Sequence, residues 1–265
     1  MLSQLVKNLF RAKGIKVPDS WDAGLADRFN TKIKEFQPAT PRPTNIFLPP
    51  STSKIAVDAC NDVSEKFENF IDDVAAAICQ SWSAWHGTAK FFGVIINAGI
   101  GLLPLGGLFG GMQMSGIMIL AKTKMTTPDY IRHAKAVAFA IGQAWMAWET
   151  SYTHASIPFP GGMVCSTTMI PSPNVPLPIA SGTAPGEALL QPALLKTSML
   201  AQVGPPGQHT EPLFDAVAQG FSQVFQLWKT TALISNIMGA GGAAPPPPSP
   251  PGPVAGAIGN GGAVT

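Results

Sequence analysis

The chain has 265 residues, and only 12% of them are charged, about half of the usual share of ~25%. Its net charge of +2 gives no electrostatic footprint for nucleic acid, so no nucleic-acid partner is expected. Charge is scarcest from residue 151 onward, where the charged residues are Glu187, Lys196, Glu211, Asp215 and Lys229. Because a free soluble monomer normally carries more surface charge, this half is expected to be covered by a partner, by other copies of the chain or by lipid.

The cysteines give no sign of a disulfide framework or a zinc site. Cys60, Cys79 and Cys165 are an odd number, are widely spaced and form no C-x-x-C pair. We interpret them as small buried apolar side chains.

Residues 1–36 are expected to form an N-terminal helical segment. Its first part, 1–12, reads as a short amphipathic helix, and its second helix would run from Asp19 or Ser20 to about Phe36. One face of the first helix carries Leu2, Leu5, Val6, Leu9 and Phe10. For this face we favour packing on a neighbouring subunit over a peripheral membrane anchor. The Pro-rich residues 37–53 form a linker, because proline blocks helix and favours extended backbone.

Residues 54–121 form a first helical module. Its helix is expected from about Ser53 to Ala89, with acidic side chains on a solvated face. These acidic residues are Asp58, Asp62, Glu65, Glu68, Asp72 and Asp73. Residues 91–121 follow without any charge and are long enough to span a bilayer. Pro104 and many glycines disfavour one straight span, so we expect a Gly-rich hairpin buried by subunits, with membrane insertion as the alternative.

Two further modules follow in the chain. Residues 122–188 form module 2, whose helix starts at Thr127-Pro128, ends near Tyr152 and leads into an extended arm with a short strand over 163–170. Residues 189–244 form module 3, with a short helix over 189–203 and a long one over 211–238. The Pro/Gly-rich residues 245–265 are expected to be an arm that lies in a groove of a neighbour.

The three long helices align on Trp85, Trp148 and Trp228, and we interpret them as an internal repeat with irregular spacing. The aligned apolar sets are Ile71/Ala134/Phe214, Val74/Val137/Val217, Ile78/Ile141/Phe221 and Trp82/Trp145/Phe225. Their spacing is that of one apolar stripe on a helix, so unrelated amphipathic helices are the competing interpretation. The fold class is therefore mainly α: three related amphipathic helical modules, extended Pro/Gly-rich arms and a few short strands.

The candidate site residues are aromatic. Trp is enriched where large apolar contacts dominate, so the repeat aromatics are candidate interface anchors, with plain helix core as the alternative. They are Trp82, Trp85, Trp145, Trp148, Phe225 and Trp228.

No motif indicates catalysis. Ser166 lacks the G-x-S-x-G turn of a hydrolase nucleophile, and the glycine pairs lack the strand and helix context of a nucleotide loop. His86, His133 and His154 have no ligand partners at metal spacing. We therefore expect no enzyme, no metal and no cofactor.

The C-terminal sequence PPPPSPPGPVAGAIGNGGA, which follows a helix that ends near Trp228, resembles the arms of uncharacterised structural proteins of phage tails and related contractile injection machines. The resemblance covers mainly residues 187–265. It implies a non-enzymatic baseplate, hub or tail subunit that lies in a virion or assembled particle and contacts its own copies and other structural proteins. The alternative is a membrane-inserting or pore-forming protein that uses residues 91–121.

Overall fold

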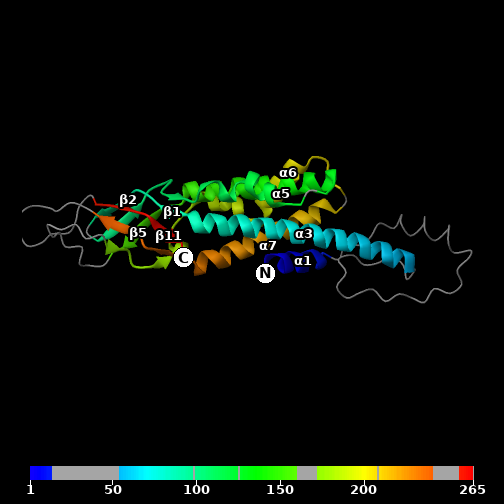
Figure 1. Cartoon of the computed structure of the whole chain (residues 1–265), viewed down its shortest axis with the longest axis horizontal. Helices are drawn as coiled ribbons and strands as arrows, with labels where there is room; N and C mark the ends of the chain where they lie inside the picture. Colours follow the sequence, from blue (N-terminus) through cyan, green and yellow to red (C-terminus); the bar gives the residue numbers. More distant parts are fainter. Residues whose placement is uncertain are drawn as a thin grey trace, which may run out of the picture.

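The computed structural model describes residues 1–13, 54–97, 99–124, 126–159, 172–207, 209–240 and 257–264. The fold is mainly helical, as the sequence predicts. The long helices lie side by side along the long axis of the molecule, and the strands gather at one end of them (Figure 1). The predicted helix ending near Phe36, the linker 37–53 and the predicted strand 163–170 lie outside the described residues.

The helices form a bundle in which α5 is central. It packs against α4 and α6, while α7 packs against α6 and α1. The α-helices are α1 (Leu2–Arg11), α3 (Lys54–Thr88), α4 (Gly116–Lys122), α5 (Pro128–Ser151), α6 (Pro192–Val203) and α7 (Thr210–Thr231). Three short 3-10 helices, η1 (Gly111–Met114), η2 (Ile179–Ser181) and η3 (Pro185–Leu190), lie in the connections.

The helix starts follow local sequence signals. The Thr127 side chain caps α5 by accepting a hydrogen bond from the backbone N–H of Tyr130 at 3.2 Å, and Pro128 occupies the first helical position. The predicted spans of α3 and α5 are confirmed to within about two residues. The predicted end of α7 is wrong, because the helix stops at Thr231 and the following residues enter a strand.

Two antiparallel sheets lie at the end of the bundle where α3, α5 and α7 finish. The first has the strand order β4-β1-β11-β8-β7, and the second has the order β5-β3-β2-β10-β9-β6. The strands are β1 (Lys90–Phe91), β2 (Val94–Asn97), β3 (Ile100–Leu103), β4 (Leu108–Phe109), β5 (His154–Pro158), β6 (Ser172–Pro173), β7 (Leu177–Pro178), β8 (Leu233–Ser235), β9 (Met238–Ala240), β10 (Ala257–Asn260) and β11 (Gly262–Val264). We call these two sheets together the β cap.

The β cap is built from segments that are distant in the sequence. Strand β10 lies between β2 and β9, and β11 lies between β1 and β8. The prediction of an arm on a neighbour is therefore wrong for residues 257–264, which pair within their own chain. The extended arm of module 2 is also paired, because β5 bonds to β3 and β7 bonds to β8. Residues 245–256 lie outside the described part of the chain.

Residues 91–121 differ from the predicted hairpin. They form the second residue of β1, all of β2, β3 and β4, then η1 and most of α4, and every second residue of β3 is buried. Buried side chains of this segment include Val94, Ile96 and Leu103, which contribute to the core. Among the helices that the structure describes, none combines the length and the apolar character needed to cross a membrane.

The predicted apolar stripe faces the bundle core. Every residue in the first three aligned sets is at least 97% buried. One apolar residue after each long helix, Val94, Ile157 or Ile237, is also fully buried in or beside the β cap. The long helices thus turn their apolar stripes toward the same core, and each is followed by a strand of the β cap.

Two smaller expectations need correction. Helix α1 packs on α3 and α7 of its own chain, where we expected a neighbouring subunit. Cys79 is exposed on α3 and has a free thiol, whereas the cysteines were expected to be buried.

Candidate interaction surface

The six candidate aromatics meet in one cluster where the bundle joins the β cap. Trp82 and Trp85 come from α3, while the others come from α5 and α7. The ring centroid of Trp145 lies 5.0 Å from that of Trp82 and 4.8 Å from that of Trp85. Trp228 completes the cluster at 5.1 Å from Trp82. Such pairs are worth about 0.5–1.5 kcal/mol each beyond area burial, so the cluster ties the three helices together.

The cluster is mainly intramolecular core. Trp85, Trp148 and Phe225 expose no surface and Trp145 only 1%, which agrees with the helix-core alternative for these four. Trp82 and Trp228 are partly buried. A contact of these two rings with another chain stays a prediction.

A buried carboxylate lies beside the cluster. Glu149 of α5 accepts a hydrogen bond from the backbone N–H of Gly110, just after β4, so it joins the bundle to the cap. Burial raises the pKa of this carboxyl group, and the Gly110 N–H and the nearby Trp85 indole lower it only in part. The indole N–H groups of Trp85, Trp145 and Trp148 are buried and have no well-aligned hydrogen-bond partner among the described residues. The junction is therefore polar inside but closed to solvent.

The outer face of the second sheet is aliphatic and exposed. Ile95 on β2 lies directly opposite Leu102 on β3, and both point outward, since their neighbours Val94 and Leu103 are buried. Ile100 on β3 and Met238 on β9 are also exposed. Exposed apolar side chains thus lie side by side on β2 and β3, and Met238 adds one on a third strand of the same sheet.

A second group of exposed apolar residues lies beside β1 and β4. Leu105 and Phe109 expose 70% and 60% of their surface, and Phe92 exposes 45%. The backbone N–H of Phe92 donates to the carbonyl of Gly107 at 2.7 Å, which joins the residue after β1 to the residue before β4. We call these three residues, together with Ile95, Ile100, Leu102 and Met238, the apolar cap surface.

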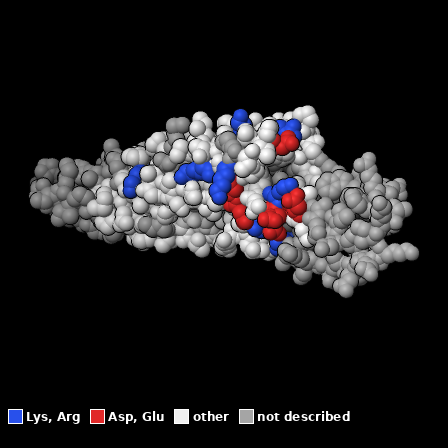
Figure 2. All heavy atoms as spheres, turned by 45° about the vertical axis from the view of Figure 1, so that its right-hand side comes forward, with Lys and Arg blue, Asp and Glu red and all other residues white. Residues whose placement is uncertain are grey.

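Charge is nearly missing from this end of the molecule. Lys90 is the only Lys, Arg, Asp or Glu in the strands that the structure describes. In Figure 2 the acidic side chains all lie toward the other, helical half of the visible face. Large exposed apolar patches are characteristic of sites that bind a protein or a membrane.

The helical half carries a groove of about 220 Å³ between α3, α5 and α7. It is lined mainly by Phe67, Phe70, Tyr130, His133 and Leu213. The polar groups there are engaged: the Tyr130 hydroxyl donates to Asp73, and His133 contacts the Thr210 hydroxyl at 3.0 Å. In the described part of the chain, no group of His, Cys, Asp and Glu could hold a metal ion. The groove therefore presents aromatic surface, with its histidine and tyrosine used in joining helices.

Comparisons with protein families, with curated proteins and with solved structures find no match to this chain. The argument about function therefore depends on the surface itself.

Sequence reasoning missed the residues of the apolar cap surface as individual site residues. The available signal was the absence of charge from residues 91–121, which marked the segment but not its exposed positions. Both faces of β2 and β3 are apolar, so the period-two alternation that separates outer from inner residues is invisible in the sequence.

Proposed function

We propose that this protein is a non-enzymatic structural subunit of a large assembly, most simply of a phage virion or a contractile tail, and that the apolar cap surface is where it contacts its own copies or other subunits. The observation that carries the proposal is an exposed, apolar and almost uncharged surface at one end of an otherwise well-packed chain (Figure 2).

The amount of exposed apolar area supports an interface. The seven residues of the apolar cap surface have exposed fractions between 42% and 70%. At ~150–250 Å² per large side chain, they expose roughly 540–900 Å² together, a range that includes the ~800 Å² per partner of a standard interface. Lone exposed apolar residues are ordinary, but this many at one end favours a covered surface.

We also propose that the three long helices are related modules, each consisting of a helix, an aromatic pair and a strand. Support comes from the equivalent burial of the residues in the first three aligned sets and from the strand of the β cap that follows each of α3, α5 and α7. Repeats of this kind would let a ring of few subunits present a higher pseudo-symmetry.

The test uses a charge pair placed on the outer sheet face. Ile95→Lys with Leu102→Glu puts opposite charges on directly opposed positions, an arrangement worth about 0.2–1 kcal/mol to the sheet, so the fold is expected to persist. The matched control is Leu194→Lys with Leu227→Glu, which changes similarly exposed residues on α6 and α7. Mass measurement by light scattering and negative-stain microscopy without detergent should show particles for wild type and control, and monomers for the sheet variant.

Two results would contradict the proposal. One is a wild-type chain that stays monomeric at every concentration. The other is a sheet variant that assembles as the wild type does.

The alternative is a membrane-active protein, which is favoured by one observation, the exposure of Leu105 and Phe109 in the β cap. Flotation with phosphatidylcholine vesicles separates the two ideas. Binding of the wild type that is lost in Ile95→Lys with Leu102→Glu would favour the membrane. Insertion of residues 91–121 as a hairpin would also require Val94, Ile96 and Leu103 to leave the core, which counts against that version.

A further inference from the structure

The two sheets of the β cap meet where their edge strands β5 and β7 lie. Strand β5 is an edge strand of the second sheet, and β7 is an edge strand of the first. We call the contact between residues 153–158 and residues 175–183 the cap seam. Backbone hydrogen bonds join the two segments at both ends, between Thr153 and Thr183 at 2.8 and 2.9 Å and from the Val175 N–H to the Pro158 carbonyl at 2.8 Å.

A buried histidine bridges the cap seam, and its hydrogen bonds fix its tautomer. His154 on β5 is only 4% exposed. The backbone N–H of Ser156 donates to its Nδ1 at 3.1 Å, and because an amide N–H can only donate, Nδ1 carries no proton. The proton is therefore on Nε2, which lies 2.8 Å from the hydroxyl oxygen of Ser181, and this hydroxyl donates onward to the Pro178 carbonyl. One chain of hydrogen bonds thus runs from β5 through the imidazole to β7.

This chain of hydrogen bonds cannot take up a proton without losing a bond. A proton on Nδ1 of His154 would point at the N–H of Ser156, so two donors would face each other and their hydrogen bond would be lost. The resulting cation would also lie in a buried site, where the charged form of a histidine is disfavoured. Burial accordingly lowers the pKa of His154.

The titratable groups on the neighbouring elements are engaged elsewhere. Strand β3, which pairs with β5, contains no charged residue, and neither do η2, β7 and β8. The hydroxyl of Tyr152, just before β5, donates to the first carbonyl of η2 at 2.7 Å. Glu187 of η3 is paired with Lys229 at 2.5 Å, and Glu149 of α5 accepts from the backbone beyond β4. A protonated His154 therefore gains no counter-charge from these elements.

We propose that His154 is an acid-sensitive switch: protonation of its imidazole breaks the hydrogen-bond chain and opens the cap seam, so that the edge strands of the two sheets separate. Ile157 and Ile179, which belong to the two sides of the seam and are fully buried, then become accessible. Acid thus adds exposed apolar area to the β cap. The inference does not depend on the proposed function, because it concerns the folded chain alone.

The direction and size of the effect follow from the two states of the seam. In the closed seam the pKa of His154 is lowered, whereas in the open seam it returns to the ordinary value of about 6.5. The hydrogen-bond chain therefore stabilises the seam fully above pH 6.5 and progressively less below it. For a histidine that stays neutral in the closed seam, the opening equilibrium rises about 30-fold between pH 7.5 and pH 5.0.

The test is hydrogen–deuterium exchange of the full chain at pH 7.5 and pH 5.0, read by mass spectrometry as protection factors, which already account for the intrinsic pH dependence of amide exchange. Protection of residues 153–158 and 179–183 is expected to fall about 30-fold at pH 5.0. His154→Gln keeps a side-chain N–H that can donate to Ser181 but takes up no proton, so its protection should stay constant. His86→Gln, on α3, is the matched control and should follow the wild type.

A second measurement needs no variant. The imidazole ¹⁵N chemical shifts of wild-type His154 should show the Nε2-protonated tautomer at pH 7.5, and protonation should appear together with the loss of protection. Three results would overturn the inference: wild-type protection of the cap seam that is equal at both pH values, an equal fall in His154→Gln, or a cationic His154 in a seam that stays protected. A fall of the same size across α5 would show general acid unfolding and would overturn it too.

Discussion

The close crossing of α4 and α5 makes a sharp prediction about one glycine. Gly142 lies inside α5, where the start of α4 crosses it, and a Cβ there would lie 2.2 Å from the backbone nitrogen of Gly116. The nearest atoms are backbone, which has no side-chain rotation to relieve the contact. Because α4 follows β4 and η1, the crossing also holds one edge of the β cap against the bundle.

The magnitude follows from two opposing terms. Alanine in a helix interior is favoured over glycine by about 0.8–1.0 kcal/mol. Against this, overpacking of a tight site costs about 1–3 kcal/mol, and a contact with backbone at 2.2 Å belongs at the upper end of that range. Gly142→Ala is therefore expected to lower the free energy of unfolding by about 2 kcal/mol. For a chain of this size, this lowers Tm by roughly 4–8 °C.

The assay is thermal and urea unfolding of the full chain, followed by far-ultraviolet circular dichroism. Gly87→Ala is the matched control, because Gly87 is an exposed residue of α3 and a Cβ there meets nothing within 4 Å. Its Tm is expected to rise by about 1–3 °C, from helix propensity alone. If Gly142→Ala raised Tm as Gly87→Ala does, the argument from the helix crossing would be wrong.

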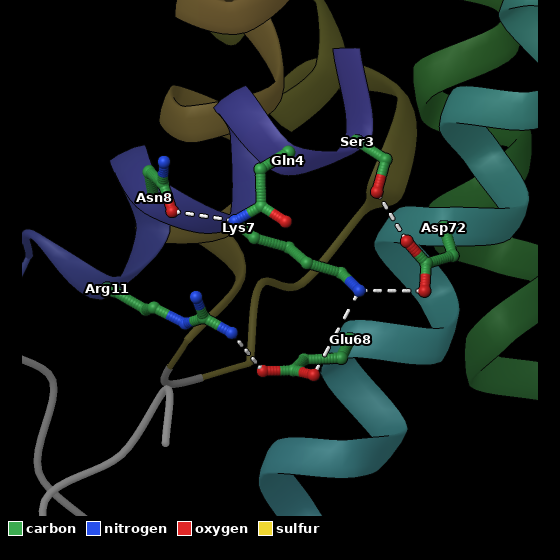
Figure 3. A network of polar contacts seen from close by, with 7 residues as sticks. All are labelled: Ser3, Gln4, Lys7, Asn8, Arg11, Glu68 and Asp72. Carbon is green, nitrogen blue, oxygen red and sulfur yellow. Dashed lines mark hydrogen bonds and ion pairs between the residues drawn. The ribbon is translucent and has the colours of Figure 1, made fainter. Parts of the chain in front are cut away.

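Three further outcomes are expected. Glu149→Gln should stabilise the chain most at alkaline pH. Because the pKa of Glu149 is raised in the folded chain, the stability that the protonated carboxyl group contributes is present at acid pH and is lost as the pH rises. The difference in Tm between variant and wild type should therefore be larger at pH 8 than at pH 5. Burial raises the pKa of both Asp72 and Asp215, but hydrogen bonds outweigh this effect and leave both pKa values lowered. Lys7 and Ser3 donate to Asp72 (Figure 3), and Lys13 and Gln219 donate to Asp215. Docking of α1 should thus weaken below about pH 4, measured as faster proteolysis after residue 13, and Lys7→Met should remove much of this dependence. Asn174→Leu should cost about 1–3 kcal/mol in unfolding free energy, because the Asn174 amide bonds to the Ile234 carbonyl and the Ile237 N–H, which would stay buried and unpaired. The comparison is Asn236→Gly on the exposed turn beside it, because glycine accepts the positive φ of 58° at that position.

The helical half of the fold could be predicted because its signals are local. The step pattern of Val74, Ile78 and Trp85 identifies a buried stripe without knowledge of its partners, and Thr127-Pro128 marks a helix start by capping chemistry. The aromatic cluster also follows from this pattern, because the apolar face of each long helix turns inward.

The β cap could not be predicted because its pairing is non-local. Strand β10 pairs with β2, with Ile258 opposite Ile95, although the two strands are far apart in the sequence. The periodicity of a segment does not identify so distant a partner. The same limit applies to α1, whose amphipathic face was read correctly but assigned to the wrong partner. An apolar stripe indicates that a helix face is buried, but only the tertiary structure identifies the element that buries it.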